Sequence, residues 1–147
     1  MRIHALILGL VTAATLAVAA ASPSGSDPRA FKVIVHPDNA AQSIGRDLLR
    51  NAYLGKGATW PRDVVVKPIG LSSKFAAREQ FSRAVLKKTP SQLKNYWTQQ
   101  IFSGKGVPPP EAGSTSDVIE FVLAHPGAVG YLPADVDPGK AKVIAVE

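Results

Sequence analysis

The chain contains no cysteine among its 147 residues. This absence excludes disulfide bridges, thiolate metal ligands and a cysteine nucleophile. Aromatic residues are few, at 7%, and acidic residues are outnumbered, with 11 Asp and Glu against 17 Lys and Arg. The formal net charge of +6 favours anionic partners, although net charge does not determine a fold. The length is that of one ordinary globular domain.

The one long apolar run of the chain lies near its start, over residues 5–21. Arg2 precedes the run, small residues end it at Ala21, and a polar segment containing Ser22 and Pro28 follows. A short basic start, an apolar middle and small residues before a polar exit are typical of an export signal. A membrane anchor is the alternative, but the run is rich in alanine and falls short of the roughly 20 strongly apolar residues that a spanning helix needs.

We therefore predict three parts: an export signal peptide over residues 1–21, a flexible linker over 22–29 and one folded domain over 30–147. Removal of the signal leaves no membrane span, so the mature protein is expected to be periplasmic or secreted. Export also argues against nucleic acid as a partner.

Hydrophobic spacing predicts four strands. In residues 31–35, every second side chain is a large apolar one on the same face, as expected of a strand. The continuous β-branched run 64–66 predicts a strand buried on both faces at the centre of the sheet. Two further apolar runs, 128–132 and 143–146, complete the set.

Capping signals and apolar spacing predict four helices between these strands. The first begins at Ser43 and ends at Gly55, and the second begins at Ser72 or Ser73. Together with the strands, this order predicts an α/β domain with a mixed, mostly parallel sheet flanked by about four helices.

The third helix carries the clearest signal. Thr89, Pro90 and Gln92 combine a capping box with proline at the first helical position. Gly104 is placed to end this helix, and Ser114 to begin the fourth.

Positive charge is concentrated in the middle of the sequence. Residues 46–105 hold 12 Lys and Arg against three acids, whereas residues 106–147 hold two against six. One interpretation is an anion-attracting face, where the helix N-termini at Ser72, Ser73 and Thr89 supply backbone N–H donors. The alternative is a solvated basic flank, which is the commoner role of such runs.

Signals for catalysis or metal binding are weak. His36 and His125 each precede a proline in a turn, and no nucleophile-elbow sequence is present. The pairs His36 with Asp38 and Asp135 with Asp137 lack the further ligands that zinc or calcium requires. We predict a protein that is not an enzyme and has no cofactor and no metal.

Glycine and aromatic residues favour structural roles. The Gly-containing segment 103–106 follows a predicted helix, so its glycines are better explained as a helix stop than as a phosphate loop. Tyr96, Trp97 and Phe102 are expected in the core, whereas Trp60 is either a lid residue or a plug at the end of the core.

Four segments, in order and at matching intervals, carry a resemblance to the phosphate ABC transporter substrate-binding protein family. They are Phe-Lys-Val-Ile-Val-His-Pro at 31–37, Leu-Gly-Lys at 54–56 with Trp60, Tyr-Trp at 96–97 leading into Ile-Phe-Ser-Gly-Lys-Gly at 101–106, and Pro-Gly-Ala-Val-Gly-Tyr at 126–131. The resemblance implies a type II periplasmic binding-protein fold. Full-length members have two lobes that close on phosphate, so a domain of this size resembles one lobe in a short form.

The sequence departs from the family at its phosphate-binding segment. In the family, Gly-Ser-Gly-Thr precedes a helix that begins Arg-acidic-x-Phe. Here Arg-Glu-Gln-Phe is present at 78–81, but the four preceding residues, 74–77, are Lys-Phe-Ala-Ala. Ser72 and Ser73 lie just upstream and are the candidates to replace the missing hydroxyls.

Two hypotheses of different classes follow. The first is an exported, non-enzymatic solute-binding-like protein that binds phosphate or a similar anion weakly through Ser72, Ser73, Lys74 and Arg78. Its partners are then the anion and a membrane permease or other envelope protein. The alternative is an envelope interaction or accessory module that keeps the fold and has lost phosphate binding.

Overall fold

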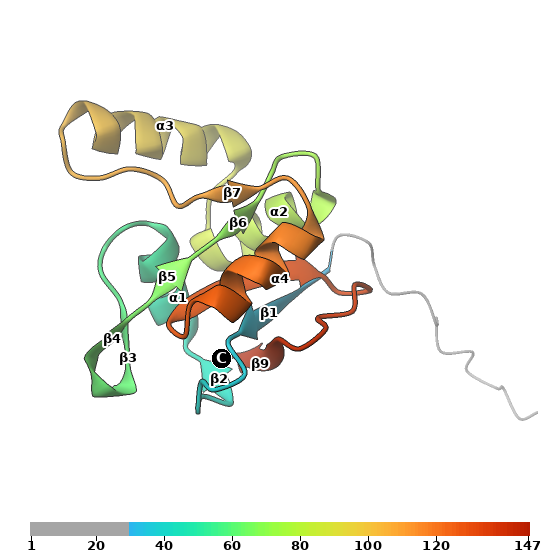
Figure 1. The fold of residues 1–147 in the computed structure, drawn as a ribbon. Helices are drawn as coiled ribbons and strands as arrows, with labels where there is room; N and C mark the ends of the chain where they lie inside the picture. The colour runs from blue at the N-terminus through green and yellow to red at the C-terminus, as the bar shows by residue number, and fades with distance from the viewer. Residues whose placement is uncertain (1–29) are drawn as a thin grey trace, which may run out of the picture.

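The structure, a computed structural model, describes residues 30–147 (Figure 1). The predicted signal peptide (1–21) and linker (22–29) lie outside the described residues. The description therefore concerns the predicted domain alone.

A five-stranded mixed sheet forms the centre of the domain, in the order β2-β9-β1-β8-β5. The pairs β1–β8 and β1–β9 are antiparallel, whereas the outer pairs β2–β9 and β5–β8 are parallel. The strands are β1 Phe31–Val35, β2 Ser43–Ile44, β5 Lys67–Pro68, β8 Ala128–Pro133 and β9 Lys142–Val146.

The mixed sheet is confirmed, but the expectation that it is mostly parallel needs correction. Val35 pairs with Val129 and Phe31 with Pro133, so the chain re-enters the sheet at the end where β1 leaves it. The central strand β1 consequently runs opposite to both neighbours, and parallel pairing is confined to short outer strands.

The predicted central strand at 64–66 is wrong. Val64–Val65 is β4, which pairs with β3 (Thr59–Trp60) in a two-stranded hairpin outside the main sheet (Figure 1). Val64 is 42% exposed and Val65 61% exposed, and only Val66 is buried. A β-branched run reports strand preference but does not say which sheet the strand joins.

Trp60 plugs the end of the core. Its side chain is buried, and its indole Nε1–H donates a hydrogen bond to the carbonyl of Gly127 at 3.0 Å. The same glycine approaches the hairpin closely, because a Cβ at Gly127 would lie 2.5 Å from the Val65 carbonyl oxygen. The β3–β4 hairpin is therefore fixed to the loop before β8.

The first two helices begin later than predicted. Helix α1 spans Arg46–Tyr53 with Gly45 as its N-cap, because Ser43 belongs to strand β2. Helix α2 spans Ala76–Phe81, and its N-cap is Phe75 in an extended conformation, without a side-chain cap. The prediction that Ser72 or Ser73 caps α2 is therefore wrong.

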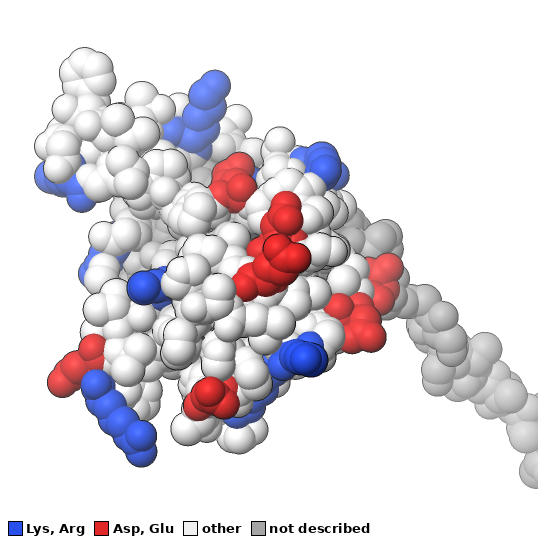
Figure 2. Space-filling view, in the orientation of Figure 1, with Lys and Arg blue, Asp and Glu red and all other residues white. Residues whose placement is uncertain are grey.

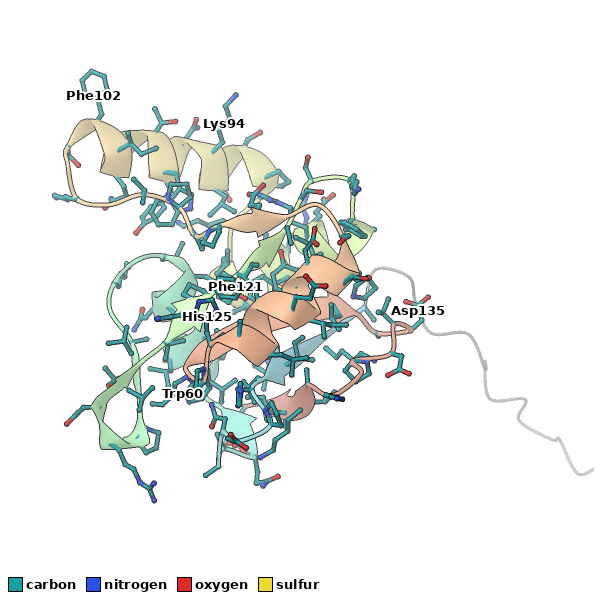
Figure 3. The ribbon with its side chains drawn as sticks, viewed as in Figure 1. Trp60, Lys94, Phe102, Phe121, His125 and Asp135 are labelled. Carbon is teal, nitrogen blue, oxygen red and sulfur yellow. The ribbon has the colours of Figure 1, made fainter. Side chains whose placement is uncertain are left out.

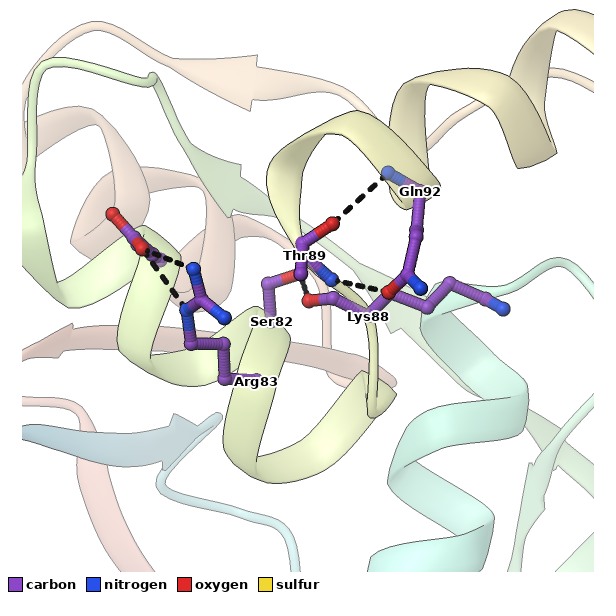
Figure 4. Close-up of polar contacts among 6 residues, drawn as sticks. Ser82, Arg83, Lys88, Thr89 and Gln92 are labelled. Carbon is purple, nitrogen blue, oxygen red and sulfur yellow. Dashed lines mark hydrogen bonds and ion pairs between the residues drawn. The ribbon is translucent and has the colours of Figure 1, made fainter.

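Helix α2 continues into the π-helical turn Ser82–Leu86. The chain leaves this turn at Lys87, whose φ of 58° is left-handed, and the Ser82 hydroxyl donates to the carbonyl of Lys88 at 2.8 Å (Figure 4). Phe81 and Val85 are buried, as the apolar spacing predicts.

Helix α3 spans Pro90–Phe102 and has the predicted capping box. The Gln92 N–H donates to the Thr89 hydroxyl at 3.2 Å, and the Thr89 N–H donates to the Gln92 side chain at 2.9 Å (Figure 4). Trp97 is buried as expected, but Phe102 is 95% exposed and so does not belong to the core.

Helix α4 spans Thr115–Ala124, and Ser114 caps it as predicted by accepting from the Asp117 N–H at 3.1 Å. Just before α4, β7 (Glu111–Ala112) pairs in parallel with β6 (Gly70–Leu71). None of the helices within residues 30–147 is long and apolar enough to cross a membrane.

The sheet is covered on both faces. A Cβ at Gly130 would lie 2.8 Å from Val118 Cγ1 on α4, whereas the next residue, Tyr131, stacks on Phe81 of α2. Because successive residues of a strand face opposite sides, α4 and α2 lie on opposite faces of β8. Figure 1 shows α4 in front of the sheet in this view.

Replacing Gly130 by alanine should destabilise the domain by about 1–3 kcal/mol, because the added methyl would force α4 away from β8. Ile69 Cγ2 and Val122 Cγ2 would also lie within 3.3 Å of the new carbon, which leaves the side chains little room to yield. Urea unfolding of Gly130→Ala measures the loss. The control is Gly113→Ala, where no atom lies within 4 Å; an equal loss in both variants would contradict the close approach.

Candidate functional site

A groove of about 500 Å³ lies between α2, α3 and the segment that leads into β7. Polar and charged side chains line it together with apolar ones. The lining residues are Ser73, Arg78, Glu79, Ser82, Pro90, Leu93, Lys94, Trp97, Pro108 and Glu111.

The groove continues inward as a small cavity of about 50 Å³ with largely aromatic walls, formed in part by Tyr53, Phe81, Trp97 and Tyr131. Phe81 and Tyr131 stack at a centroid distance of 4.0 Å, and the Tyr53 ring meets Phe81 at 4.7 Å with its edge toward the face. These contacts make the inner wall apolar and rigid.

Arg78 is the central charged residue of the groove. Its Nη1 donates to the carbonyl of Leu71 at 2.8 Å and also to Glu111 Oε1, with which it forms an ion pair. The two hydrogen bonds connect α2 to both strands of the β6–β7 pair. The guanidinium is therefore held in place by the fold, and its side chain is still 26% exposed.

Tyr131 stabilises the position of Arg78 indirectly, through Leu71. Its hydroxyl accepts a hydrogen bond from the Leu71 N–H at 3.2 Å, so it fixes the strand residue whose carbonyl holds Arg78. The pKa of Tyr131 is raised from 10.0 to about 12. Burial is the main cause and Glu111 adds to it, whereas the Leu71 N–H and Arg78 act in the opposite direction. Burial and the neighbouring Tyr131 also raise the pKa of Tyr53.

The four residues that the sequence analysis selected lie close together along the chain, but they face different surroundings. Ser73 and Arg78 line the groove. Lys74 is not among the lining residues, and its Nζ lies 5.3 Å from the centre of the Phe75 ring. The Ser72 hydroxyl is buried and has no hydrogen-bond partner among residues 30–147.

The backbone of Ser72 explains its inward position. Its N–H donates to the carbonyl of Ala112 at 3.0 Å, and its own carbonyl accepts from the Phe75 N–H at 3.2 Å. Ser72 thus extends the β6–β7 pair by one residue before the chain turns into α2.

Lys94, Trp97 and Glu111 also line the groove, and none of them was predicted as a site residue from the sequence. Glu111 is 33 residues from Arg78 in the chain, so no local pattern joins the two. Trp97 was expected only as a core residue. It is buried as expected, and it also forms part of the groove wall.

His36 and His125 have local structural roles, as predicted. His36 Nδ1 accepts from the Asp38 N–H at 3.1 Å, and His125 Nδ1 lies 2.8 Å from the Phe121 carbonyl oxygen at the end of α4. Within the part of the chain that the structure describes, no three His, Asp or Glu side chains gather as a metal site would require.

The Ser72 hydroxyl provides a test of the buried turn before α2. Ser72→Ala should leave the free energy of unfolding unchanged or raise it by up to about 1 kcal/mol, because the buried hydroxyl gains no hydrogen bond in the fold. The matched control is Ser82→Ala, which should lose about 1 kcal/mol with its bond to the Lys88 carbonyl. Urea unfolding compares the two, and a larger loss at Ser72 would show that its hydroxyl has a partner.

Tyr131 should make the domain sensitive to alkali. Because its pKa is raised in the folded state, its neutral form is favoured there, and this stability is fully present below the ordinary pKa of 10.0. As pH rises from 10.0 toward 12, the stability falls by about 3 kcal/mol.

Urea unfolding at increasing pH measures this loss. Tyr131→Phe should reduce the fall in the free energy of unfolding between pH 10 and 12. Tyr96 is only half-buried on α3, so Tyr96→Phe should reduce this fall less. Equal slopes for the wild type and Tyr131→Phe would contradict the assignment.

Comparisons with known proteins show which solved structures share this fold. No family model matches the chain, and no curated protein matches it in sequence. Solved structures do match. The ABC-type phosphate transport receptor from Vibrio cholerae superposes with a TM-score of 0.61 at 18% identity, over 79% of this chain and 45% of that one.

Two further structures agree. A protein assigned as a phosphate ABC transporter substrate-binding protein, with bound phosphate, from Clostridium perfringens gives a TM-score of 0.60 at 16% identity, over 79% of this chain and 44% of that one. PstS from Borrelia burgdorferi gives a TM-score of 0.57 at 15% identity, over 80% of this chain and 47% of that one.

The chain thus spans less than half the length of the structures it matches. At these identities the similarity concerns the fold. The resemblance seen in the sequence is confirmed at that level: the domain has the fold of a single lobe of the phosphate ABC transporter substrate-binding proteins.

Proposed function

We propose that this protein binds phosphate or a chemically similar oxyanion, weakly and without catalysing a reaction, at the groove beside α2. The observation that carries the proposal is the position of Arg78. Both of its hydrogen bonds to residues 30–147 use Nη1, so Nε and Nη2 are left to donate to a ligand. A guanidinium edge with two parallel donors matches two oxygens of a phosphate.

Ser73 and Lys94 add donors at the same groove, one from the turn before α2 and one from α3. Ser72 and Lys74 flank Ser73 in that turn, and they are the other two anion-binding residues predicted from the sequence. A ligand bound between these residues would contact two separate elements, α2 and α3.

Glu111 gives the groove a means of selection. Its carboxylate pairs with Arg78 and is 45% exposed. An ionised carboxylate accepts a hydrogen bond from an oxyanion that still carries a proton and repels one that carries none. Hydrogen phosphate has such a proton near neutral pH, whereas sulfate does not, so the groove should favour phosphate.

Weak binding is expected for two reasons. The groove contains the acids Glu79 and Glu111 beside its cations, which lowers the net attraction for an anion. The matched proteins are more than twice as long as the aligned part of this chain, so the chain supplies about half of what they contain.

The fold also bears on the protein's location and partners. The matched structures come from proteins described as transport receptors and substrate-binding proteins, which supports a role in the periplasm or outside the cell. A membrane permease or another envelope protein is the partner class we propose.

An NMR titration of the protein with phosphate tests the proposed site. Saturable shifts should be confined to residues 72–78, 94 and 111, and the domain should gain about 1.4 kcal/mol of stability when phosphate is about nine times its Kd. The double variant Lys74→Ala/Arg78→Ala should lose both responses.

The control is Lys67→Ala/Lys140→Ala, which removes two exposed charges that do not line the groove and should keep both responses. Unchanged binding in the groove variant would contradict the site. The absence of saturable shifts at millimolar phosphate would favour the alternative of an interaction module that has kept only the fold.

The role of Glu111 predicts a difference between anions. At matched ionic strength, the wild type should bind phosphate more tightly than sulfate, and Glu111→Gln should reduce this preference by improving sulfate binding. NMR titrations with the two anions measure the ratio of Kd values. An unchanged ratio in Glu111→Gln would show that the carboxylate does not select the ligand.

A further inference from the structure

The far end of α3 is an exposed apolar surface. Every residue from 101 to 108 is exposed, and the large apolar side chains among them are Ile101 at 54%, Phe102 at 95% and Val107 at 74% exposure. We call residues 101–107 the α3 tip. Figure 3 shows Phe102 projecting from the end of α3, away from the rest of the domain.

The start of α3 is firmly attached, so the tip is held in a defined place. Tyr96 donates its hydroxyl proton to the Leu54 carbonyl at 2.6 Å, Trp97 is buried beside Gly55, and the capping box fixes the first turn. The next helical turn after Trp97 extends beyond these contacts. Phe102 is thus presented to the outside by an ordered helix.

Two lysines accompany the α3 tip: Lys105 belongs to it, and Lys94 lies about two helical turns before Phe102. Residues 80–110 contain no acid, and their other cations, Arg83, Lys87 and Lys88, precede the start of α3. Lys94 projects from the outer side of α3, on the side to which Phe102 points (Figure 3). In Figure 2 the far end of α3 shows blue and white side chains and no red ones.

The acids that border this segment are already paired. Glu79 forms an ion pair with Arg83, and Glu111 forms one with Arg78. No lysine takes part in an ion pair of residues 30–147. Lys94 and Lys105 are therefore available to an external anion.

We propose that the α3 tip docks on an anionic lipid surface, with Phe102 and its apolar neighbours entering the interface and the lysines facing the headgroups. An exposed aromatic residue with apolar neighbours and nearby lysines, in a segment without acids, has the composition of segments that bind such membranes. Protein interfaces, by contrast, are depleted in lysine and enriched in arginine. The proposal does not depend on phosphate binding in the groove.

The absence of cysteine makes a local test possible, because a single introduced cysteine is labelled alone. Ser103→Cys, next to Phe102, carries a polarity-sensitive fluorophore. The control label is at Val65→Cys in the β3–β4 hairpin, where the side chain is 61% exposed. Both proteins carry residues 1–147, so any contribution of residues 1–29 is common to them.

Vesicles of phosphatidylcholine with about 30% phosphatidylglycerol should shift the emission at position 103 to the blue, and added salt should reverse part of the shift. Vesicles of phosphatidylcholine alone should give little change. The label at position 65 should not respond. An absent shift at 103, or equal shifts at both positions, would overturn the proposal.

Two variants of the Ser103→Cys protein separate the contributions. Lys105→Gln should weaken binding to the anionic vesicles roughly fivefold, as expected for one lysine near the surface. Phe102→Ser should also weaken binding to the anionic vesicles, whereas Val143→Ser, at an exposed apolar residue of β9, should have no effect. A blue shift that grows with protein concentration without vesicles would overturn the proposal in favour of a second copy covering the tip.

Discussion

The contacts of Tyr131 are the constraint on which the groove depends. This residue lies in β8 opposite Val33 of β1, so its position is set by the longest strand pairing of the sheet. Its ring stacks on Phe81 and fixes α2, and its hydroxyl fixes the backbone of Leu71. The Leu71 carbonyl then holds Arg78, whose Nη1 also reaches Glu111. The buried side chain of Tyr131 thus contacts both α2 and the β6–β7 pair and joins them to the main sheet. It lies on the face of the sheet opposite α4.

Much of the fold was predictable where the signal is local. Strand β1 and the capped starts of α3 and α4 agree with the prediction, because alternation and capping act within a few residues. The run 64–66 has an equally strong local preference, but its place in the hairpin is decided by Trp60 and Gly127, which are 67 residues apart. Phe102 was misassigned because helical spacing identifies a face and cannot tell where the body beneath it ends.

The candidate site shows the same division. Of its four predicted residues, which occupy one short segment, Ser73 and Arg78 line the groove. The structure adds Lys94, Trp97 and Glu111 from segments that only the fold brings near. The start of α2 was also misplaced, because Ser72 continues the backbone pairing to Ala112 and is not available as a cap. Whether a serine such as Ser72 pairs with a strand or caps a helix depends on tertiary contacts, and these cannot be read from a single sequence.

Residues 74–77 are Lys-Phe-Ala-Ala, whereas the resemblance noted in the sequence implies Gly-Ser-Gly-Thr at this place. Phe75, Ala76 and Ala77 now form the entrance to α2, where they offer no side-chain donor, and Phe75 instead packs against the core. The anion binding proposed for this end of α2 would then rely on side chains, chiefly that of Arg78, rather than on hydroxyls around the helix start. Since Glu111 competes for the same guanidinium, any anion has to share Arg78 with a carboxylate already in place. A groove built in this way is suited to reversible binding of a protonated oxyanion and unsuited to tight sequestration.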